Sequence, residues 1–512
     1  MIENLYMGLD CSTQSLTATI IDLDNSQIIL NKSVNFEKDL AQYKTTSGVV
    51  YGENGVVYSY ADMWAEALDL LFLTLSKEID LSKIKAISAS GQQHASVYLD
   101  SLNAFDFDSE TPLAGQIKKH LTRSESPVWL DTSTEEECKE ITEAMGGEAG
   151  VLSATGSVAI LRFTGAQIRK FSKENPTAYA ATKRIHLNSS FICSVLAGKD
   201  CPIDFGDGAG MNLMNIAGLC WDKKAVEVTA DNLAEKLPSL VASDTCVGDI
   251  SSYFAINYGF SPDTKIIAST GDNPSSLIGI GAMIEGSAII SLGTSDTYFS
   301  AIDKATPAAN AHIFGNPADN YMSLICFRNG SLAREAMKDL VSVSWAFFDN
   351  IAFADYVPSI DDEKFIIPFF SDEISPNISS NAPKYIPNDN MTDAQKVVYT
   401  IEGQFLNMYT QAQKMSKNKV DNIILTGGAS KSEGIAQVIA DIFQAKVSRL
   451  KLSLNSAALG ACMRAIKNHT GISWQELSQR FCGQDEFKSP RAEYAEVYQQ
   501  KADKWNDLIA NL

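Results

Sequence analysis

Two short segments, one in each half of the chain, place apolar strands around a turn of Gly, Ser and Thr. They run from Met7 to Ile21 and from Ala288 to Phe299. Because β-branched and aromatic runs flank each turn, each segment predicts a β-hairpin with small polar residues at its tip. Such a tip directs backbone N–H groups and hydroxyls into one concavity, which binds phosphate oxygens without dense positive charge. Two tips that face each other would hold a nucleoside triphosphate.

A hairpin rich in Ser and Thr more often has only a structural role, so one copy is weak support for phosphate binding. Two copies, together with Gly427-Gly428 at the exit of another predicted strand, favour the phosphate interpretation. The chain contains no G-x-x-x-x-G-K-[ST] sequence, so the site is not a P-loop.

Asp10 is the acid of the first hairpin and comes just before its turn. A carboxylate at this place can hold the Mg²⁺ that accompanies a triphosphate, through water because Mg²⁺ dehydrates reluctantly. The alternative is an Asp that stabilises the turn through local hydrogen bonds. A mostly apolar strand rarely carries an acid inward without a partner, which favours the metal role.

Asp272 follows the predicted strand 265–269 and a glycine, so its carboxylate is expected to point into a cleft. There it can take the proton from a substrate hydroxyl as that oxygen attacks a γ-phosphate. The alternative makes Asp272 or Asn273 the N-cap of a helix that starts near Pro274. Both roles are compatible if Asn273 caps the helix and Asp272 reacts.

A polar loop, residues 90–96, follows the predicted strand 84–89. It contains Gln92, Gln93 and His94, which offer several hydrogen-bonding groups side by side. Ligand sites in α/β folds lie at the carboxyl ends of strands, so the loop suits recognition of a polyol. The alternative is a structural histidine, which is the more common role of a lone one.

Composition and charge restrict the possible partners. The chain has 512 residues, too many for one ordinary core, so two domains are expected. Its net charge of −20 argues against binding to nucleic acid or to an anionic membrane surface, so an anionic ligand must be held by local donors. No apolar stretch approaches the ~20 residues of a transmembrane helix, and no signal-peptide pattern is visible. The 9 cysteines lack C-x-x-C spacing, which favours reduced thiols in a cytoplasmic protein over disulfides or a Cys/His metal site.

Strand and helix patterns alternate along most of the chain, which predicts an α/β architecture. Helices are expected at 61–72 and 433–444, a strand is expected at 422–425, and 353–395 is typical of an irregular insertion. A domain boundary at 281–286 gives each half its own hairpin, so the halves look like a diverged duplication.

Several strings occur in the order found in the FGGY carbohydrate kinases, a family that the chain resembles over nearly its full length. These strings are Gly8-Leu9-Asp10 with Ser12-Thr13-Gln14, Gly91-Gln92-Gln93-His94, Thr270-Gly271-Asp272-Asn273-Pro274, Ser291-Leu292-Gly293-Thr294-Ser295 and Thr426-Gly427-Gly428-Ala429-Ser430. Within the family the chain is most similar to xylulose kinases of the eukaryotic type, through residues 127–134, 162–165, 204–212 and 328–332.

The resemblance implies two actin-like ATPase domains of the ribonuclease H type, with the active site in the cleft between them. Residues 1–285 would bind the sugar and carry the catalytic base, and residues 286–512 would bind the nucleotide. The implied reaction transfers a phosphoryl group from ATP, with Mg²⁺, to D-xylulose to give D-xylulose 5-phosphate, with Asp272 as general base on the terminal hydroxyl.

Individual residues carry over by their motifs. The implied sugar contacts are His94, Arg162, Asp272 and Asn273. The implied nucleotide contacts are Thr13, Gln14, Gly293, Thr294, Trp345, Gly428, Ala429 and Ser432, and Asp10 is the implied metal residue. Many bacterial members have an arginine shortly after the Trp-x-Asp of the sugar loop, whereas here Thr132-Ser133-Thr134 follows Asp131, so Arg162 would supply that positive donor.

Two alternatives remain open. A kinase for another ketose or polyol, such as ribulose or glycerol, would use the same base. A non-kinase actin-like ATPase is a different class, and Asp272 and the Gln92-Gln93-His94 loop argue against it, since a protein without a small-molecule acceptor does not need them. The expected partners are therefore a sugar and ATP, without nucleic acid or membrane, for a cytoplasmic monomer or homodimer.

Overall fold

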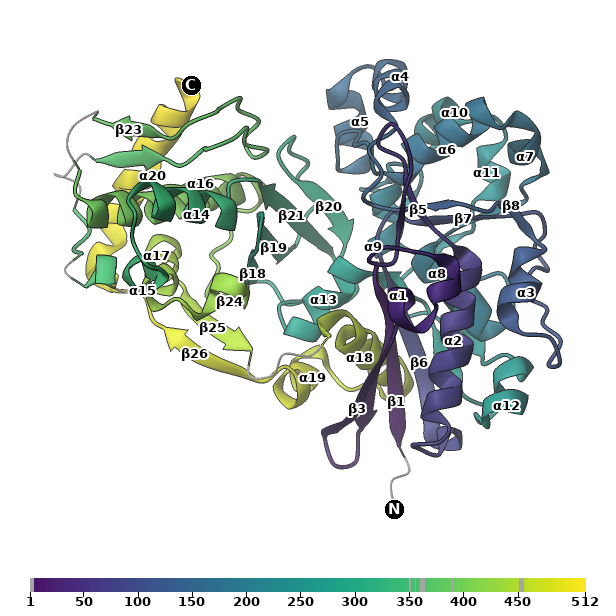
Figure 1. Ribbon diagram of the computed structural model, residues 1–512. Coiled ribbons are helices and arrows are strands. Elements are labelled where there is room, and N and C mark those ends of the chain that lie inside the picture. The colour runs from purple at the N-terminus through teal and green to yellow at the C-terminus, as the bar shows by residue number, and fades with distance from the viewer. Residues whose placement is uncertain (1–3, 350, 355, 360–363, 388–390, 451–454) are drawn as a thin grey trace. The chain divides into compact units, whose positions relative to one another are not determined.

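The computed structural model describes residues 4–349, 351–354, 356–359, 364–387, 391–450 and 455–512 (Figure 1). These residues form two compact units. The first comprises Met1–Met283, Ile313–Tyr321 and Ser453–Cys482, and the second comprises Ile284–His312, Met322–Leu452 and Gly483–Leu512. None of the helices in the described ranges is long and apolar enough to cross a membrane.

The first unit is built on a sheet whose strands follow the order β15-β16-β6-β1-β2-β3, with β17 also paired to β6. The bounds are β1 Leu5–Cys11, β2 Ser15–Asp22, β3 Gln27–Asn35, β6 Ile84–Gly91, β15 Cys246–Asp249, β16 Lys265–Ile267 and β17 Thr270–Gly271. β1 and β2 are antiparallel, which confirms the first predicted hairpin, and β6 runs parallel to β1.

Apolar helices cover this sheet. The helix predicted at 61–72 is α2, Ala61–Leu75, and it packs with α8, Asn188–Ala197, against the strands. The pair α13, Asp272–Ile280, and α18, Ser456–Thr470, also packs together, and α18 contacts β1 and β6. In Figure 1, α2 and α18 lie on opposite sides of β1 and β6. The strand interior is therefore buried on both faces, which explains its continuous apolar runs.

A second, mainly helical layer of the same unit has its own apolar core. Its helices are α4 Glu135–Met145, α5 Glu148–Thr155, α6 Thr164–Glu174, α7 Pro176–Ala181, α10 Lys223–Thr229 and α11 Leu233–Lys236. Its short strands are β7 Ser96–Leu99, β8 Leu121–Arg123 and β10 Arg184–Leu187, and α9, Phe205–Gly208, borders it. The remaining elements of the unit include α1 Phe36–Asp39, α3 Leu113–Lys118, α12 Ser252–Tyr258 and α19 Trp474–Phe481.

The sheet of the second hairpin has the strand order β20-β21-β19-β18-β24-β25-β26, with β20 at His312–Gly315, and the six strands from β21 to β26 repeat the order of the first sheet. The bounds are β18 Ser287–Leu292, β19 Asp296–Ile302, β21 Tyr321–Phe327, β24 Asn422–Gly427, β25 Lys446–Leu450 and β26 Gln484–Lys488. Again a central strand, β18, pairs antiparallel with its hairpin partner and parallel with the next strand, β24. The helices are α14 Ser331–Leu340, α15 Trp345–Asp349, α16 Asp393–Met415, α17 Glu433–Phe443 and α20 Ala495–Ala510. The shared order supports the interpretation of a diverged duplication.

The sequence predicts one break in the chain, between residues 285 and 286, whereas the units are interleaved. The first break does lie close by, between Met283 and Ile284, but two later segments belong to the first unit. One of them contains α18, which contacts β1 and β6 and therefore groups with them. Within 353–395, predicted as an irregular insertion, the described residues include only the short strands β22, Phe365–Ile367, and β23, Lys384–Ile386, with a 3-10 turn and the start of α16.

Candidate active site

Three strands of the first unit end side by side. Asp10 of β1 pairs with Ser90 of β6, and Ser90 pairs with Thr270 of β17. The strands are parallel, so the residues that follow them leave the sheet at one edge. This register brings the first hairpin turn, the Gln92-Gln93-His94 loop and Asp272 to the same edge of the sheet.

Asp272 and Asn273 begin helix α13, and Gln93 is tied to them. The Asn273 N–H donates to Asp272 Oδ1 at 2.8 Å, and Asn273 Nδ2 donates to Gln93 Oε1 at 2.8 Å. The N-cap position is held by Gly271, so the alternative in which Asp272 or Asn273 caps the helix is wrong. Asp272 is the first helical residue, where its charge is favoured by the helix dipole.

The Asp272 carboxyl has an unusual acidity. Burial, and secondly the charge of Asp10, raise its pKa from 3.8 to about 7, while the backbone N–H groups of Asn273 and Gln93 lower it. A carboxyl whose pKa lies near neutrality can both accept and release a proton at physiological pH. The arrangement therefore suits general base chemistry.

His94 is held rigidly beside this carboxyl loop. Its backbone has a φ of 71°, and Nδ1 lies 2.9 Å from the carbonyl oxygen of Gly210. A carbonyl only accepts, so Nδ1 carries a proton. The ring also packs on Phe163, with centroids 4.5 Å apart, which brings the loop of the partly exposed Arg162 next to His94.

Asp10 is 2% exposed and both of its carboxylate oxygens are engaged. Oδ1 accepts from Ser90 Oγ at 2.8 Å, and Oδ2 accepts from Asn455 Nδ2 at 2.9 Å. The described residues contain no group of three or more His, Cys, Asp or Glu that could hold a metal ion. Asp10 therefore fits an ion only through water, as expected for Mg²⁺ that keeps most of its hydration shell.

The other two residues implied for the first turn differ in their surroundings. Thr13 Oγ1 accepts a hydrogen bond of 2.9 Å from Nε1 of Trp129, the tryptophan of the Trp-Leu-Asp string. Gln14 is exposed, and its carbonyl accepts from the backbone N–H of Phe36.

Asp207 belongs to the same site, although its sequence context as a loop of small residues is ambiguous. It is 1% exposed, its Oδ2 accepts from Ser189, and burial together with the charges of Asp204 and Asp272 holds its pKa well above the usual range. A Cβ atom on Gly271 would lie 2.9 Å from Asp207 Oδ1 and from Gln93 Nε2, so only glycine fits between them. The signal in the sequence was the acid pair Asp204 and Asp207, three residues apart.

Several buried polar atoms near these strand ends have no hydrogen-bond partner in the structure. They are both amide atoms of Gln92 and Oδ1 of Asn188. An unpaired buried polar group costs about 1 to 3 kcal/mol, so such a cluster is expected where a polar ligand or ordered water completes the site.

In the second unit, Gly293 and Thr294 form the tip between β18 and β19, and Thr294 is exposed. Leu292 at the end of β18 pairs with Gly427 at the end of β24, so the tip and the Gly427-Gly428 exit are adjacent. Gly427 has a φ of 86°, and a Cβ there would lie 2.4 Å from the Leu292 carbonyl oxygen. This close approach leaves backbone groups of both loops at one edge.

A hydrogen bond joins the start of α17, at Ser432, to α15, the helix that contains Trp345. Ser432 is the N-cap of α17, where its Oγ accepts from the Ile435 N–H, and it donates to the carbonyl oxygen of Asp349 in α15. Trp345 begins α15 and is 46% exposed. Gly428 is exposed and Ala429 is partly exposed in the turn before Ser432. The structure thus brings Gly293, Thr294, Gly428, Ala429, Ser432 and the helix of Trp345 into one unit.

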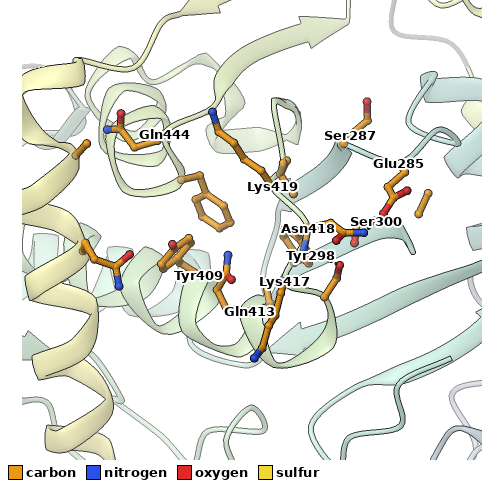
Figure 2. Close-up of a pocket in the computed structure, with 18 residues that line it drawn as sticks. Glu285, Ser287, Tyr298, Ser300, Tyr409, Gln413, Lys417, Asn418, Lys419 and Gln444 are labelled. Atoms are coloured by element: carbon orange, nitrogen blue, oxygen red, sulfur yellow. Dashed lines mark hydrogen bonds between the residues drawn. The ribbon is translucent and has the colours of Figure 1, made fainter. Parts of the chain in front are cut away.

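A cavity of about 340 Å³ in the second unit lies away from these residues. Figure 2 shows Tyr298, Tyr409, Lys417 and Lys419 around it. Its lining includes Ser287, at the start of β18, whereas the tip follows the end of β18, about 16 Å along the strand. The cavity is therefore separate from the predicted nucleotide residues.

Two family models match the chain. The N-terminal domain of the FGGY family of carbohydrate kinases matches residues 5–279, and the C-terminal domain of the same family matches residues 288–468. The chain therefore belongs to the FGGY family of carbohydrate kinases. It is a carbohydrate kinase with the two-domain mixed α/β fold of that family, and FGGY kinases use ATP as the phosphate donor.

Curated relatives and solved structures agree with this assignment. The chain is 38% identical to xylulose kinase from Mus musculus, over 92% of this chain and 88% of that protein. It is 37% identical to xylulose kinase 2 from Arabidopsis thaliana, over 90% of this chain and 87% of that protein. The crystal structure of xylulose kinase from Rhodospirillum rubrum has the same fold, with a TM-score of 0.83 at 17% identity over 99% of both chains.

Proposed function

We propose that this kinase phosphorylates D-xylulose with ATP to give D-xylulose 5-phosphate. The observation that carries the proposal is the Asp272 carboxyl, with a pKa of about 7, at the strand edge that it shares with Gln93 and His94. Support for the sugar comes from relatives of 37% and 38% identity that are named xylulose kinases and are matched over most of their length.

Asp272 would act as the general base. Above pH 7 its carboxylate accepts the proton of the terminal hydroxyl as that oxygen attacks the γ-phosphate. The hydrogen bonds from the N–H groups of Asn273 and Gln93 orient the carboxylate toward the hydroxyl that it would deprotonate. A base of this kind contributes about 10²- to 10⁴-fold to the rate.

The sugar would be bound by His94, Arg162 and Asn273. The Nδ1 N–H of His94 donates to the Gly210 carbonyl, which fixes the ring, and the imidazole would contact a sugar hydroxyl. Arg162, in the loop beside His94, would donate to the carbonyl or to a hydroxyl. Asn273 keeps its Nδ2 on Gln93, so its own contact with the sugar would be made through Oδ1.

The nucleotide would be bound by the second unit. Backbone groups at Gly293 and Thr294 would contact the phosphates, and Gly428 and Ala429, with Ser432 behind them, would lie near the adenosine. Trp345 is 46% exposed and offers an apolar face for the base. From the first unit, Thr13 and Gln14 would contribute to the phosphate site.

Mg²⁺ would be held through water by Asp10, because both carboxylate oxygens already accept hydrogen bonds from Ser90 and Asn455. When bound, the ion would neutralise charge on the β- and γ-phosphates. This role is tested by measuring the activity of the wild type and of Asp10→Asn as a function of Mg²⁺ concentration. An unchanged Mg²⁺ dependence would reduce Asp10 to a structural residue of the turn.

The substrate is tested by measuring ADP release with a panel of D-xylulose, D-ribulose, L-ribulose, D-fructose, D-gluconate and glycerol. We expect kcat/KM for D-xylulose to exceed that of every other acceptor by about tenfold or more, because a site built for one set of hydroxyls leaves its polar groups unpaired with another. A higher kcat/KM for any other acceptor would replace xylulose as the substrate while leaving the kinase assignment intact.

A further inference from the structure

The turn between β21 and α14 carries the string Arg328-Asn329-Gly330-Ser331, which the proposed function leaves without a role. This turn lies directly against the tip of the β18–β19 hairpin. The Ser331 N–H donates to the carbonyl oxygen of Gly293 at 2.9 Å. A Cβ on Gly330 would lie 2.6 Å from the Asp296 nitrogen and 2.8 Å from the Thr294 oxygen. Only glycine lets the turn come this close to the tip.

Arg334, one helical turn further along α14, forms an ion pair with Asp296, which follows the tip. Its NH1 donates to Asp296 Oδ2 at 2.7 Å, and its NH2 donates to Asp296 Oδ1 at 2.8 Å. Arg334 is 1% exposed and Asp296 is 2% exposed, so the pair is buried. Two parallel hydrogen bonds from a planar guanidinium fix both the place and the rotation of the carboxylate.

Gln404 of α16 joins the helix and the turn. Its Oε1 accepts from Arg334 NH1 at 3.1 Å, and its Nε2 donates to the carbonyl oxygens of Asn329 at 2.6 Å and Gly330 at 3.1 Å. On the other side of the turn, the buried carboxylate of Glu373 accepts from the backbone N–H groups of Arg328 and Asn329. The tip is therefore supported by a closed network that reaches two helices.

The tip itself has few other supports, because Thr294 and Ser295 are exposed. Backbone groups that bind a charged ligand are effective when they are held in place before the ligand arrives. A buried ion pair contributes little net stability compared with apolar side chains of the same volume, so stability alone does not account for this one.

From this geometry we propose that Arg334 is a positioning residue for nucleotide binding. It holds the phosphate-binding tip through Asp296, while Gln404 fixes both Arg334 and the Gly330 turn. The proposal rests on the proposed function, because it takes Gly293 and Thr294 as the phosphate site. A lysine at position 334 would keep the positive charge but would not form two parallel hydrogen bonds to the Asp296 carboxylate.

The test compares Arg334→Lys with Arg491→Lys. Arg491, whose side chain is 34% exposed, donates from Nε and NH2 to Oδ2 of the fully buried Asp441, so it is an arginine–carboxylate pair of the same unit outside the tip turn. For each variant one measures the Kd of a non-hydrolysable ATP analogue without sugar, the KM values for ATP and sugar, and the melting temperature. We expect Arg334→Lys to weaken analogue binding and raise the ATP KM by about tenfold, with the sugar KM within about twofold. Arg491→Lys should lower the melting temperature and leave both KM values within about twofold.

Three outcomes decide the proposal. Arg334 would be structural only if Arg334→Lys bound the nucleotide as tightly as the wild type while Arg334→Lys and Arg491→Lys lost a similar amount of melting temperature. If Arg334→Lys does not fold, Gln404→Met removes the bonds from Gln404 to Arg334 and to the Gly330 turn while it keeps the Arg334–Asp296 pair. Unchanged analogue binding in that variant would also overturn the proposal. Gly293→Glu distinguishes the assignment of the tip as phosphate site from the positioning role of Arg334. If Gly293→Glu does not weaken analogue binding, the assignment of the tip to the nucleotide fails. If Gly293→Glu weakens binding and Arg334→Lys does not, only the positioning role is rejected.

Discussion

Six strands of each sheet follow the same order, and the two sheets place different side chains at matching positions. In the first unit, Asp10 is the next-to-last residue of β1 and pairs with Ser90 of β6. In the second unit, Ser291 is the next-to-last residue of β18 and pairs with Thr426 of β24. The following pair ends in glycine in both sheets, at Gly91 and at Gly427. The duplicated edge thus carries a carboxylate in one unit and a hydroxyl in the other.

The electrostatics of the two edges differ accordingly. Around Asp272, burial and the charge of Asp10 raise the pKa of a carboxyl to about 7. Next to the second tip, the charge of Asp296 is balanced by the guanidinium of Arg334. An edge with clustered acids suits proton transfer, and an edge with neutral donors suits a polyanion. The topology supplies the place, and the side chains decide which ligand binds there.

Among variants that test this difference between the two edges, Asp272→Asn should have the largest effect on activity. Loss of the base should reduce kcat by about 10²- to 10⁴-fold, with binding of an ATP analogue unchanged. Because the folded pKa is raised above 3.8, ionisation of Asp272 costs stability as the pH rises through about 7, so the variant should melt no lower than the wild type above that pH. Asp249→Asn is the control, since Asp249 is an exposed acid paired with Lys265. A variant that keeps more than half of its activity would remove Asp272 from the mechanism.

A methyl group added at each of the two matching glycines should affect a different ligand at each edge. Gly427→Ala places Cβ 2.4 Å from the Leu292 oxygen at a positive φ and should raise the KM for ATP, whereas Gly91→Ala places Cβ 2.2 Å from Asn188 Oδ1 and should raise the KM for the sugar. A strain of about 1 to 3 kcal/mol corresponds to roughly 5- to 150-fold in kcat/KM. Gly259→Ala, where nothing lies within 4 Å, controls for the backbone term alone. If each variant raised both KM values equally, the division of ligands between the edges would be wrong.

Ser291→Asp gives the second edge the carboxylate of the first. Repulsion between this charge and the phosphates should weaken ATP-analogue binding by about tenfold, and Ser291→Asn, which is neutral and of the same size, should not. Equilibrium binding without sugar measures the effect. Equal affinities of the two variants would show that the phosphates lie elsewhere.

The effect of Asp10→Asn on the pKa of Asp272 should be the smallest of these effects and is read from pH profiles. Asp272 is active only when deprotonated, so kcat/KM of the wild type should fall as the pH drops below about 7. Removing the charge of Asp10 should lower the pKa of Asp272 and move this acid limb to lower pH by roughly half a unit to one unit, with burial keeping it above 3.8. An unmoved limb would mean that Asp10 carries no charge near neutral pH.

Much of the fold could be predicted from local patterns. Both hairpins, helix α2 and helix α17 lie where the apolar periodicity and turn residues place them, because each is specified by neighbours in the chain. The capping role of Asn273 was wrong, because the helix starts two residues earlier and Gly271 takes the N-cap position. The sequence did not show that α18 packs on β1, because this packing joins residues that are remote from each other in the chain.

The sequence by itself determined the family, the duplicated hairpins and the identity of the residues at the strand ends, since these depend on residue types at fixed spacing. Only the tertiary structure decided which groups became partners. It placed Asp207 and Gln93 on either side of Gly271, it surrounded Asp272 with enough buried atoms and negative charge to raise its pKa to about 7, and it joined Arg334 to Asp296 and Gln404. The physical reason is that desolvation and hydrogen bonding depend on distances of a few ångströms between segments remote in sequence, and no local pattern encodes those distances.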